Sequence, residues 1–93
     1  MATFFLFGKY SAASLKEISG KRTQLAADIV KKLGGELKSM HALLGEHDLV
    51  LMVELPGITE AMKCSLSLAR ESGIGFTTAP AVPVEQFDKI AAG

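Results

Sequence analysis

The chain has 93 residues, the size of one compact domain, because a chain this short cannot supply two hydrophobic cores. Ten Lys and Arg residues balance ten Asp and Glu residues, and no segment concentrates positive charge, so we expect no nucleic-acid partner. Apolar residues make up 48% of the chain. A domain of this size buries only about 60% of its unfolded surface, so we expect some apolar surface to remain for self-association.

The sequence contains no signal for a membrane or an oxidising compartment. No window approaches the roughly 20 apolar residues of a membrane span, and the N-terminus lacks the pattern of a secretory signal. The single cysteine, Cys64, has no nearby His or second Cys, so we expect it to pack as a small apolar residue. We therefore expect a cytoplasmic protein without metal, cofactor or membrane partner, in which residues 1–93 form a single domain.

The first predicted elements are a strand and a helix. Thr3 to Phe7 is a β-prone apolar run that is too short for a buried helix. The spacing of Ser14 and Glu17 is that of a capping box, which predicts a helix that begins at Ser14 and ends at Gly34-Gly35. One stripe of this helix is expected to face the core: Leu15, Ile18, Leu25, Ile29 and Leu33. The basic residues are expected on a solvated face: Lys16, Lys21, Arg22, Lys31 and Lys32.

The middle of the chain predicts a β-hairpin. Glu36 to Leu44 and His47 to Leu55 are strand-like segments. Gly45-Glu46 between them has the glycine that a two-residue type II′ turn requires at its first position.

A second helix and a last strand follow. The helix is predicted between Pro56-Gly57 and Ser72-Gly73, and Ile74 to Val82 predicts the strand. One side of this helix carries Ile58, Met62, Ser65, Leu66 and Ala69. Val84 to Ala92 predicts a short terminal helix with Phe87 and Ile90 as its apolar anchors.

The order β-α-β-β-α-β predicts a ferredoxin-like α+β sandwich, in which an antiparallel sheet carries both helices on one face. The first and third strands, Phe4 to Phe7 and Leu49 to Val53, are then central neighbours and are apolar on both faces. Such strands must be covered on both sides. We therefore expect two copies to cover each other's bare face in an isologous dimer.

The predicted turn also sets which residues share the bare face. It places Leu43 opposite Asp48, His41 opposite Val50 and Ser39 opposite Met52. The bare face then carries apolar groups interrupted by polar ones: Leu37, Ser39, His41, Leu43, Asp48, Val50, Met52 and Glu54. We expect this face to line a cleft between subunits. Tyr10 either projects its hydroxyl over the mouth of this cleft or packs at the entry of the following helix, which is the commoner role.

His41 and Asp48 are diagonal neighbours on that face. One interpretation is that Asp48 orients His41 and favours its protonated form, which gives an acid/base or anion-binding pair. The alternative is that Asp48 bonds local backbone N–H groups and that His41 is a packed or rim residue. His41 and His47 are not expected to share a metal, because the register puts them on opposite faces.

The segment from Leu43 to Val50 resembles the G-x-Y-D signature of the GYD-domain family of small bacterial proteins. Gly45, His47 and Asp48 occupy the motif positions, and His47 stands where the signature usually has tyrosine. Other segments also resemble that family: Phe4 to Tyr10, Arg22-Thr23, Gly35-Glu36, Pro56-Gly57 and Phe76-Thr77-Thr78. The resemblance implies a dimeric α+β barrel.

A similar hairpin occurs in the effector domain of leucine-responsive, or feast/famine, regulators, which bind amino acids at subunit interfaces. The chain shows no counterpart of their helix-turn-helix domain. We favour a homo-oligomeric small-molecule-binding or accessory protein, whose cleft holds a metabolite. The expected contact residues are Tyr10, Ser39, His41, Asp48 and Met52.

Two alternatives to a binding protein stay open. The first is an isomerase or cofactor-free monooxygenase that uses His41 and Asp48, which rests on fold analogy alone. The second is a purely structural oligomer. The sequence therefore leaves open whether the protein is an enzyme.

Overall fold

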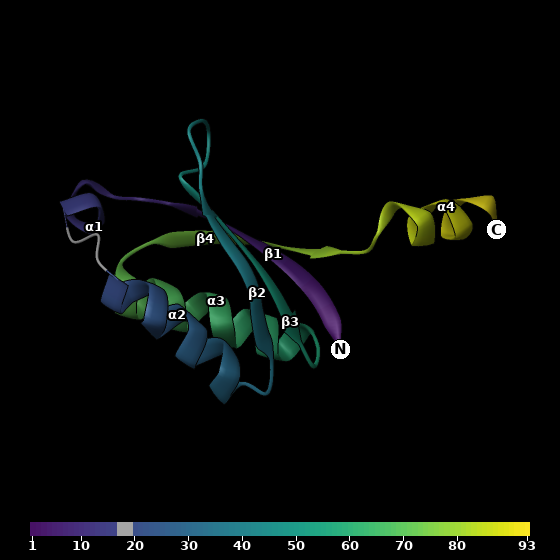
Figure 1. The fold of residues 1–93 in the computed structure, drawn as a ribbon, viewed down its shortest axis with the longest axis horizontal. Helices are drawn as coiled ribbons and strands as arrows, with labels where there is room; N and C mark the ends of the chain where they lie inside the picture. Colours follow the sequence, from purple (N-terminus) through teal and green to yellow (C-terminus); the bar gives the residue numbers. More distant parts are fainter. Residues whose placement is uncertain (17–19) are drawn as a thin grey trace.

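The computed structural model describes residues 1–16 and 20–93. Its strands are β1 (Ala2–Lys9), β2 (Glu36–Ala42), β3 (Leu49–Leu55) and β4 (Gly75–Ala81). Its helices are α1 (Ala12–Lys16), α2 (Gly20–Lys32), α3 (Ile58–Ser72) and α4 (Val84–Ala92). The four strands form one antiparallel sheet in the order β2-β3-β1-β4, so β1 and β3 are central neighbours, as predicted. In Figure 1, α2 and α3 lie together below the sheet. The predicted ferredoxin-like α+β fold is confirmed.

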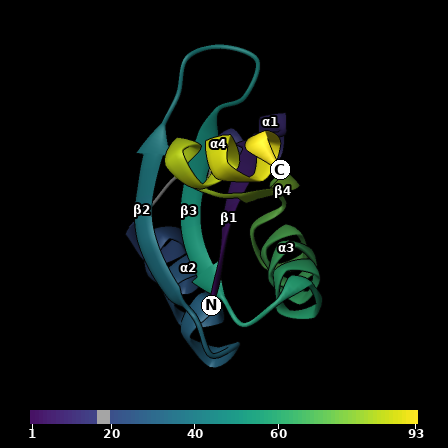
Figure 2. The same ribbon diagram turned by 90° about the vertical axis from the view of Figure 1, so that its right-hand side faces the viewer.

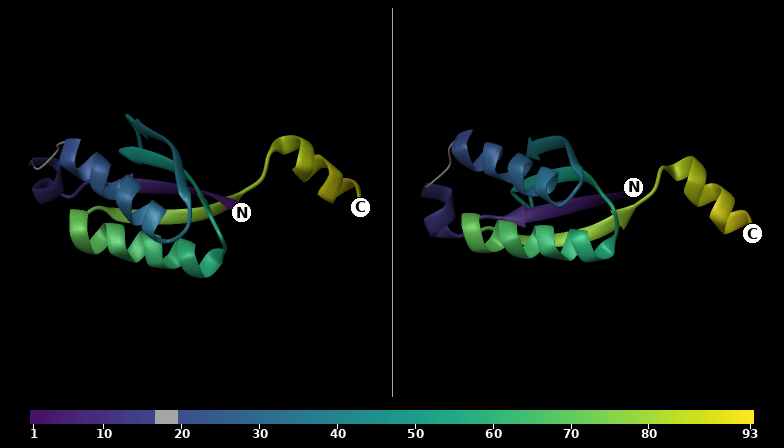
Figure 3. Two further views of the ribbon diagram at one scale, coloured as in Figure 1. Left: turned by 60° about the horizontal axis from the view of Figure 1, so that its bottom comes forward. Right: turned by 90° about the horizontal axis from the view of Figure 1, so that it is seen from below.

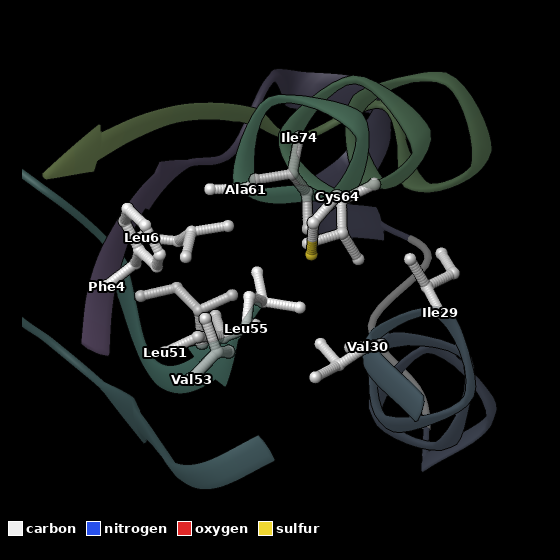
Figure 4. Packing of buried hydrophobic residues seen from close by; sticks show 13 residues of the cluster. Phe4, Leu6, Ile29, Val30, Leu51, Val53, Leu55, Ala61, Cys64 and Ile74 are labelled. Atoms are coloured by element: carbon white, nitrogen blue, oxygen red, sulfur yellow. The ribbon is translucent and has the colours of Figure 1, made fainter. Parts of the chain in front are cut away.

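The hydrophobic core fills the space between the sheet and these two helices (Figure 4). In β1, Phe4 and Leu6 are buried under the helices, whereas Phe5 and Phe7 point to the other face, because side chains alternate along a strand. Cys64 of α3 is buried in this core, as predicted, and burial raises the pKa of its thiol to about 11. The remaining core residues are apolar: Ala26, Ile29, Val30, Leu49, Leu51, Val53, Leu55, Ala61, Leu68 and Ile74.

The first helix begins earlier than predicted. Ser11 Oγ accepts the N–H of Ser14 at 3.0 Å, and Ser14 Oγ accepts the N–H of Ser11 at 2.7 Å, so these two serines form a reciprocal capping box. The predicted start at Ser14 is therefore wrong by one turn, and Glu17 and Ile18 lie outside the described residues.

The core-facing stripe of the predicted helix is confirmed only in α2. Leu25, Ile29 and Leu33 pack in or against the core, but Leu15 of α1 is 55% exposed. The predicted end is correct, since Gly34 adopts a positive φ of 83° that favours glycine after a helix.

The β2–β3 hairpin has the predicted register but a different connection. His41 pairs with Val50 and Ser39 with Met52, and Leu43 N–H donates to the Asp48 carbonyl at 2.9 Å. The strands are joined by residues 43–48, and Gly45 is not among the glycines of positive φ, so the predicted two-residue type II′ turn is wrong. Both connections leave an even number of residues between the strands, which keeps the paired residues His41, Val50, Ser39 and Met52 on their predicted face.

A β-bulge changes the start of β2. The register shifts between Leu37 and Ser39, so Leu37 pairs with Val53 and packs against the core. The prediction that Leu37 lies on the bare face is therefore wrong, because a bulge adds one residue and reverses the alternation. A side chain at the nearby Gly35 would collide with the Glu54 carbonyl oxygen, so the chain here requires glycine.

Helix α3 has the predicted bounds but buries a different side. Its C-cap Gly73 has a φ of 73°. The predicted stripe is mainly outside: Ile58, Met62 and Leu66 are 66%, 63% and 54% exposed. The helix instead buries Ala61, Cys64 and Leu68 at the same helical spacing.

Helix α4 forms where predicted, but it stands clear of the rest of the chain (Figures 1 and 3). In the view of Figure 2, along the long axis, it lies in front of the sheet. None of its residues is buried, and Phe87 and Ile90 are 58% and 62% exposed. The expectation that these two residues anchor the helix within the chain is therefore wrong. No helix in residues 1–16 and 20–93 has the length and apolar character to cross a membrane.

Candidate functional site

The sheet surface opposite α2 and α3, hereafter the open face, brings together three of the predicted site residues. Strand pairing places side chains in rows across the four strands. One row is His41, Val50, Phe7 and Thr77. The next is Ser39, Met52, Phe5 and Ala79. The open face therefore has an apolar centre on β1 and β3, with His41 and Ser39 along the β2 edge.

An aromatic series runs along β1 on the open face. The rings of Phe5 and Phe7 are stacked with centroids 6.4 Å apart, and the His47 ring lies 5.2 Å from that of Phe7. His47 therefore sits beside an open-face residue, and the prediction that the register places it with the core face is wrong. Its Nδ1 atom is buried and has no hydrogen-bond partner among the described residues.

A hollow of about 360 Å³ lies at the other end of the open face, where β4 leads into α4. Thr3, Phe5 and Met52 line it from the sheet, and residues 81–84 line it from the chain that enters α4. This volume is within the range of about 300–1,000 Å³ that is usual for small-molecule sites.

Asp48 holds the hairpin against the end of β1. Its Oδ2 accepts the backbone N–H of Tyr10 at 2.9 Å, and its own N–H donates to the Gly8 carbonyl at 2.8 Å. No hydrogen bond or ion pair joins Asp48 to His41 among the described residues. Asp48 therefore binds a backbone N–H, as in the alternative interpretation, but the donor is 38 positions away and not local to the turn.

Charged groups gather where β2 begins and β3 ends. Lys38 Nζ lies 2.8 Å from Glu36 Oε2, and Glu36 pairs across the strands with Glu54. The hydrogen bond to Glu36, followed by the charges of Glu36 and Glu54, raises the pKa of Lys38. This cluster is exposed, so it contributes polarity to one border of the open face and little stability.

The Tyr10 side chain lies elsewhere, in a cavity of about 70 Å³ on the helix side of the sheet. The Arg22 guanidinium stands 5.6 Å from the centre of the Tyr10 ring. Arg22 Nη1 donates to the Ser14 carbonyl, while Nη2 is buried without a partner among the described residues. A buried donor left unpaired costs about 1–3 kcal/mol. Tyr10 and the open-face residues therefore belong to two different places in the fold.

Arg22 is a candidate functional residue that the charge pattern does not reveal, because that pattern predicts a solvated position for it. The helical spacing does indicate that Arg22 is on the buried side of α2. Arg22 precedes Ala26 by four residues and Ile29 by seven, which puts it on the buried stripe of α2. The described residues contain no group of three or more His, Cys, Asp or Glu side chains that could hold a metal ion.

These features define a ferredoxin-like α+β domain with one sheet face open and a separate cavity under its helices. The model of the GYD domain matches residues 4–91, so the chain belongs to the GYD-domain family. No curated protein sequence matches the chain.

Solved structures agree with this fold. The chain is similar to the leucine response regulatory protein LrpA of Mycobacterium tuberculosis (TM-score 0.59, 10% identity, 88% of this chain and 51% of that one). It is also similar to an AsnC family transcriptional regulator from Agrobacterium tumefaciens (TM-score 0.59, 17% identity, 88% and 50%). It therefore spans about half the length of these two proteins. FFRP-DM1 is matched over its whole length (TM-score 0.61, 20% identity, 88% of this chain and 100% of that one).

Proposed function

We propose that the protein is a homo-oligomeric small-molecule-binding protein, in which the open faces of two copies enclose the ligand. The observation that carries this proposal is the apolar centre of the open face. Phe5, Phe7, Val50 and Met52 are only partly covered by their own chain, and α2 and α3 lie on the opposite side of the sheet (Figure 1). A second copy offers a matching surface, because the interface of a two-fold dimer is self-complementary.

Helix α4 supports the same arrangement. Val84, Phe87 and Ile90 are 69%, 58% and 62% exposed and recur at a spacing of three residues, which places them near one side of the helix. An amphipathic helix held away from its own core has lost the packing that normally stabilises it. The apolar side of α4 therefore covers part of the partner copy in this proposal.

The ligand site is the hollow beside Phe5 and Met52, extended toward Ser39 and His41. Mostly apolar walls with a few polar groups at one border are typical of sites for small metabolites. In this proposal Asp48 acts by placing the hairpin and not by activating His41. We therefore propose no isomerase or monooxygenase reaction. A solely structural oligomer is the result expected if no small molecule binds. The exclusion of nucleic acid and the cytoplasmic location stay predictions.

Thermal-shift screening with amino acids and small aromatic acids tests the ligand site. The wild type should be stabilised by at least one compound, and His41→Ala should lose that shift. Thr77→Ala is the matched control, since Thr77 lies in the same row at the other edge of the sheet. No shift with any compound, or an equal shift with His41→Ala, contradicts the ligand site.

A further inference from the structure

The residues that line the cavity between α2, α3 and the sheet are suited to the carboxylate group of a small organic acid. Six of its lining residues are apolar: Ala26, Met40, Leu49, Leu68, Ile74 and Phe76. The polar ones are Tyr10, Arg22, Thr23 and Ser72. Arg22 is the sole charged residue in this lining, so nothing among the described lining residues neutralises it.

The Arg22 guanidinium is held in place by one hydrogen bond and one aromatic contact, and one of its nitrogen atoms has no hydrogen-bond partner among the described residues. Nη1 is committed to the Ser14 carbonyl, and the Tyr10 ring supports the guanidinium plane at 5.6 Å. Nη2 is buried and unpaired among the described residues. Ser72 does not compete for it, because its Oγ donates to Leu68 and accepts from the N–H of Ile74.

The cavity volume decides the size of the ligand. About 70 Å³ is roughly half of an apolar cavity of about 150 Å³ that holds benzene. There is space for a carboxylate and its neighbouring carbon atoms, whereas a phosphate group brings more oxygen atoms than the two N–H groups of the unpaired Arg22 Nη2 and the nearby hydroxyls satisfy.

We propose that this cavity binds the carboxylate of a small organic acid, with Arg22 Nη2 as the charged donor and Tyr10 as the wall that orients the guanidinium. The site lies within one chain and on the opposite side of the sheet from the open face. It is therefore independent of the proposed intersubunit site, and an experiment can contradict either site without contradicting the other.

Titration of the isotope-labelled full chain with sodium propionate, followed by NMR at constant ionic strength, tests the site. Saturable shifts are expected in the amides near Tyr10, Arg22 to Ala26 and Ser72 to Phe76. Propionamide has the same shape without the charge and should bind at least about tenfold more weakly, because a hydrogen bond between charged groups is lost. Equal responses to the two compounds, or tighter binding of inorganic phosphate, would overturn the proposal.

Variants identify the residue responsible. Arg22→Gln should weaken propionate binding at least about tenfold, while Lys21→Gln, which removes an exposed charge one residue away, should leave it unchanged. Tyr10→Phe keeps the ring under the guanidinium and should retain binding, which provides a second test if Arg22→Gln does not fold. Unchanged binding by folded Arg22→Gln, or equal losses in Arg22→Gln and Lys21→Gln, would contradict the site. Met52→Asp, on the open face, should still bind propionate.

Discussion

The Asp48 carboxylate accepts the backbone N–H of Tyr10 at 2.9 Å, across 38 positions of sequence. The aspartate of the G-x-Y-D signature therefore joins the hairpin to the point where β1 ends and the helical segment begins. Asp48 N–H adds a second link, to the Gly8 carbonyl at 2.8 Å. This relationship gives the signature residue a structural role that does not require a reaction.

Loss of the Asp48 carboxylate should therefore reduce stability. We expect Asp48→Ala to lower the free energy of unfolding by about 1.5–3 kcal/mol, since a part-buried hydrogen bond to a charged group is removed. Asp48→Asn keeps an acceptor oxygen and should lose less. Urea denaturation measures both. Glu46→Ala, in the same loop, is the control, because Glu46 contributes its backbone carbonyl and not its side chain to the contact with Lys9. Equal stability of Asp48→Ala and wild type contradicts this role.

Substitution by alanine should reduce stability at Gly35 and leave it nearly unchanged at Gly45. A Cβ at Gly35 would meet the Glu54 carbonyl and the Leu55 side chain, whereas a Cβ at Gly45 would meet nothing within 4 Å. We expect Gly35→Ala to cost about 1–3 kcal/mol or more through overpacking. Gly45→Ala should change stability by less than about 0.5 kcal/mol. Thermal and urea unfolding of the two variants provide the comparison, and a larger loss for Gly45→Ala would be inconsistent with the hairpin described above.

Replacing His47 by the tyrosine of the family signature should not weaken the fold. His47 contributes a ring against Phe7, but its buried Nδ1 has no partner among the described residues. Tyrosine keeps the aromatic contact and removes that nitrogen, so we expect His47→Tyr to be at least as stable as the wild type. His47→Ala should lose about 1 kcal/mol with the ring contact. A His47→Tyr variant less stable than His47→Ala would refute this account of the position.

The Cys64 thiol should be inert at neutral pH and should make stability depend on alkaline pH. Its pKa rises from 9.0 to about 11 on folding, so the folded state favours the protonated thiol. The resulting stabilisation is complete below pH 9 and is lost as the pH rises toward 11, with a total of about 2–3 kcal/mol. The difference in unfolding free energy between wild type and Cys64→Ala should therefore narrow over that range. A constant difference, or rapid reaction of the native thiol with Ellman's reagent at pH 7, contradicts the burial.

The fold could be predicted from the sequence because its signals are local and consistent. The apolar run of β1, the glycine after α2 and the alternation in β3 each specify one element, and the order of elements specifies the sheet. The predicted hairpin register is correct although the predicted turn is wrong. Residues 43–48, like a two-residue loop, leave an even number of residues between the strands, so the same residues pair.

The wrong predictions arise where a sequence pattern is compatible with two structures. Both Ser11 and Ser14 can cap a helix, and α3 has two apolar stripes, of which the one with Ala61 and Cys64 faces the core. The bulge beside Lys38 has no sequence signal of its own. The sites were harder to predict than the fold, because Tyr10 lies on the helix side of the sheet beside Arg22, a residue whose charge predicts a surface position.

Sedimentation velocity at micromolar concentration tests the central claim most directly, that two copies cover the open face. The wild type should sediment as a dimer or a larger assembly, and Met52→Asp, which places a charge on the open face, should give a folded monomer. Met62→Asp is the matched control, because Met62 is 63% exposed on α3, and it should leave the assembly intact. A monomeric wild type, or a Met52→Asp variant that assembles as the wild type does, would contradict the account.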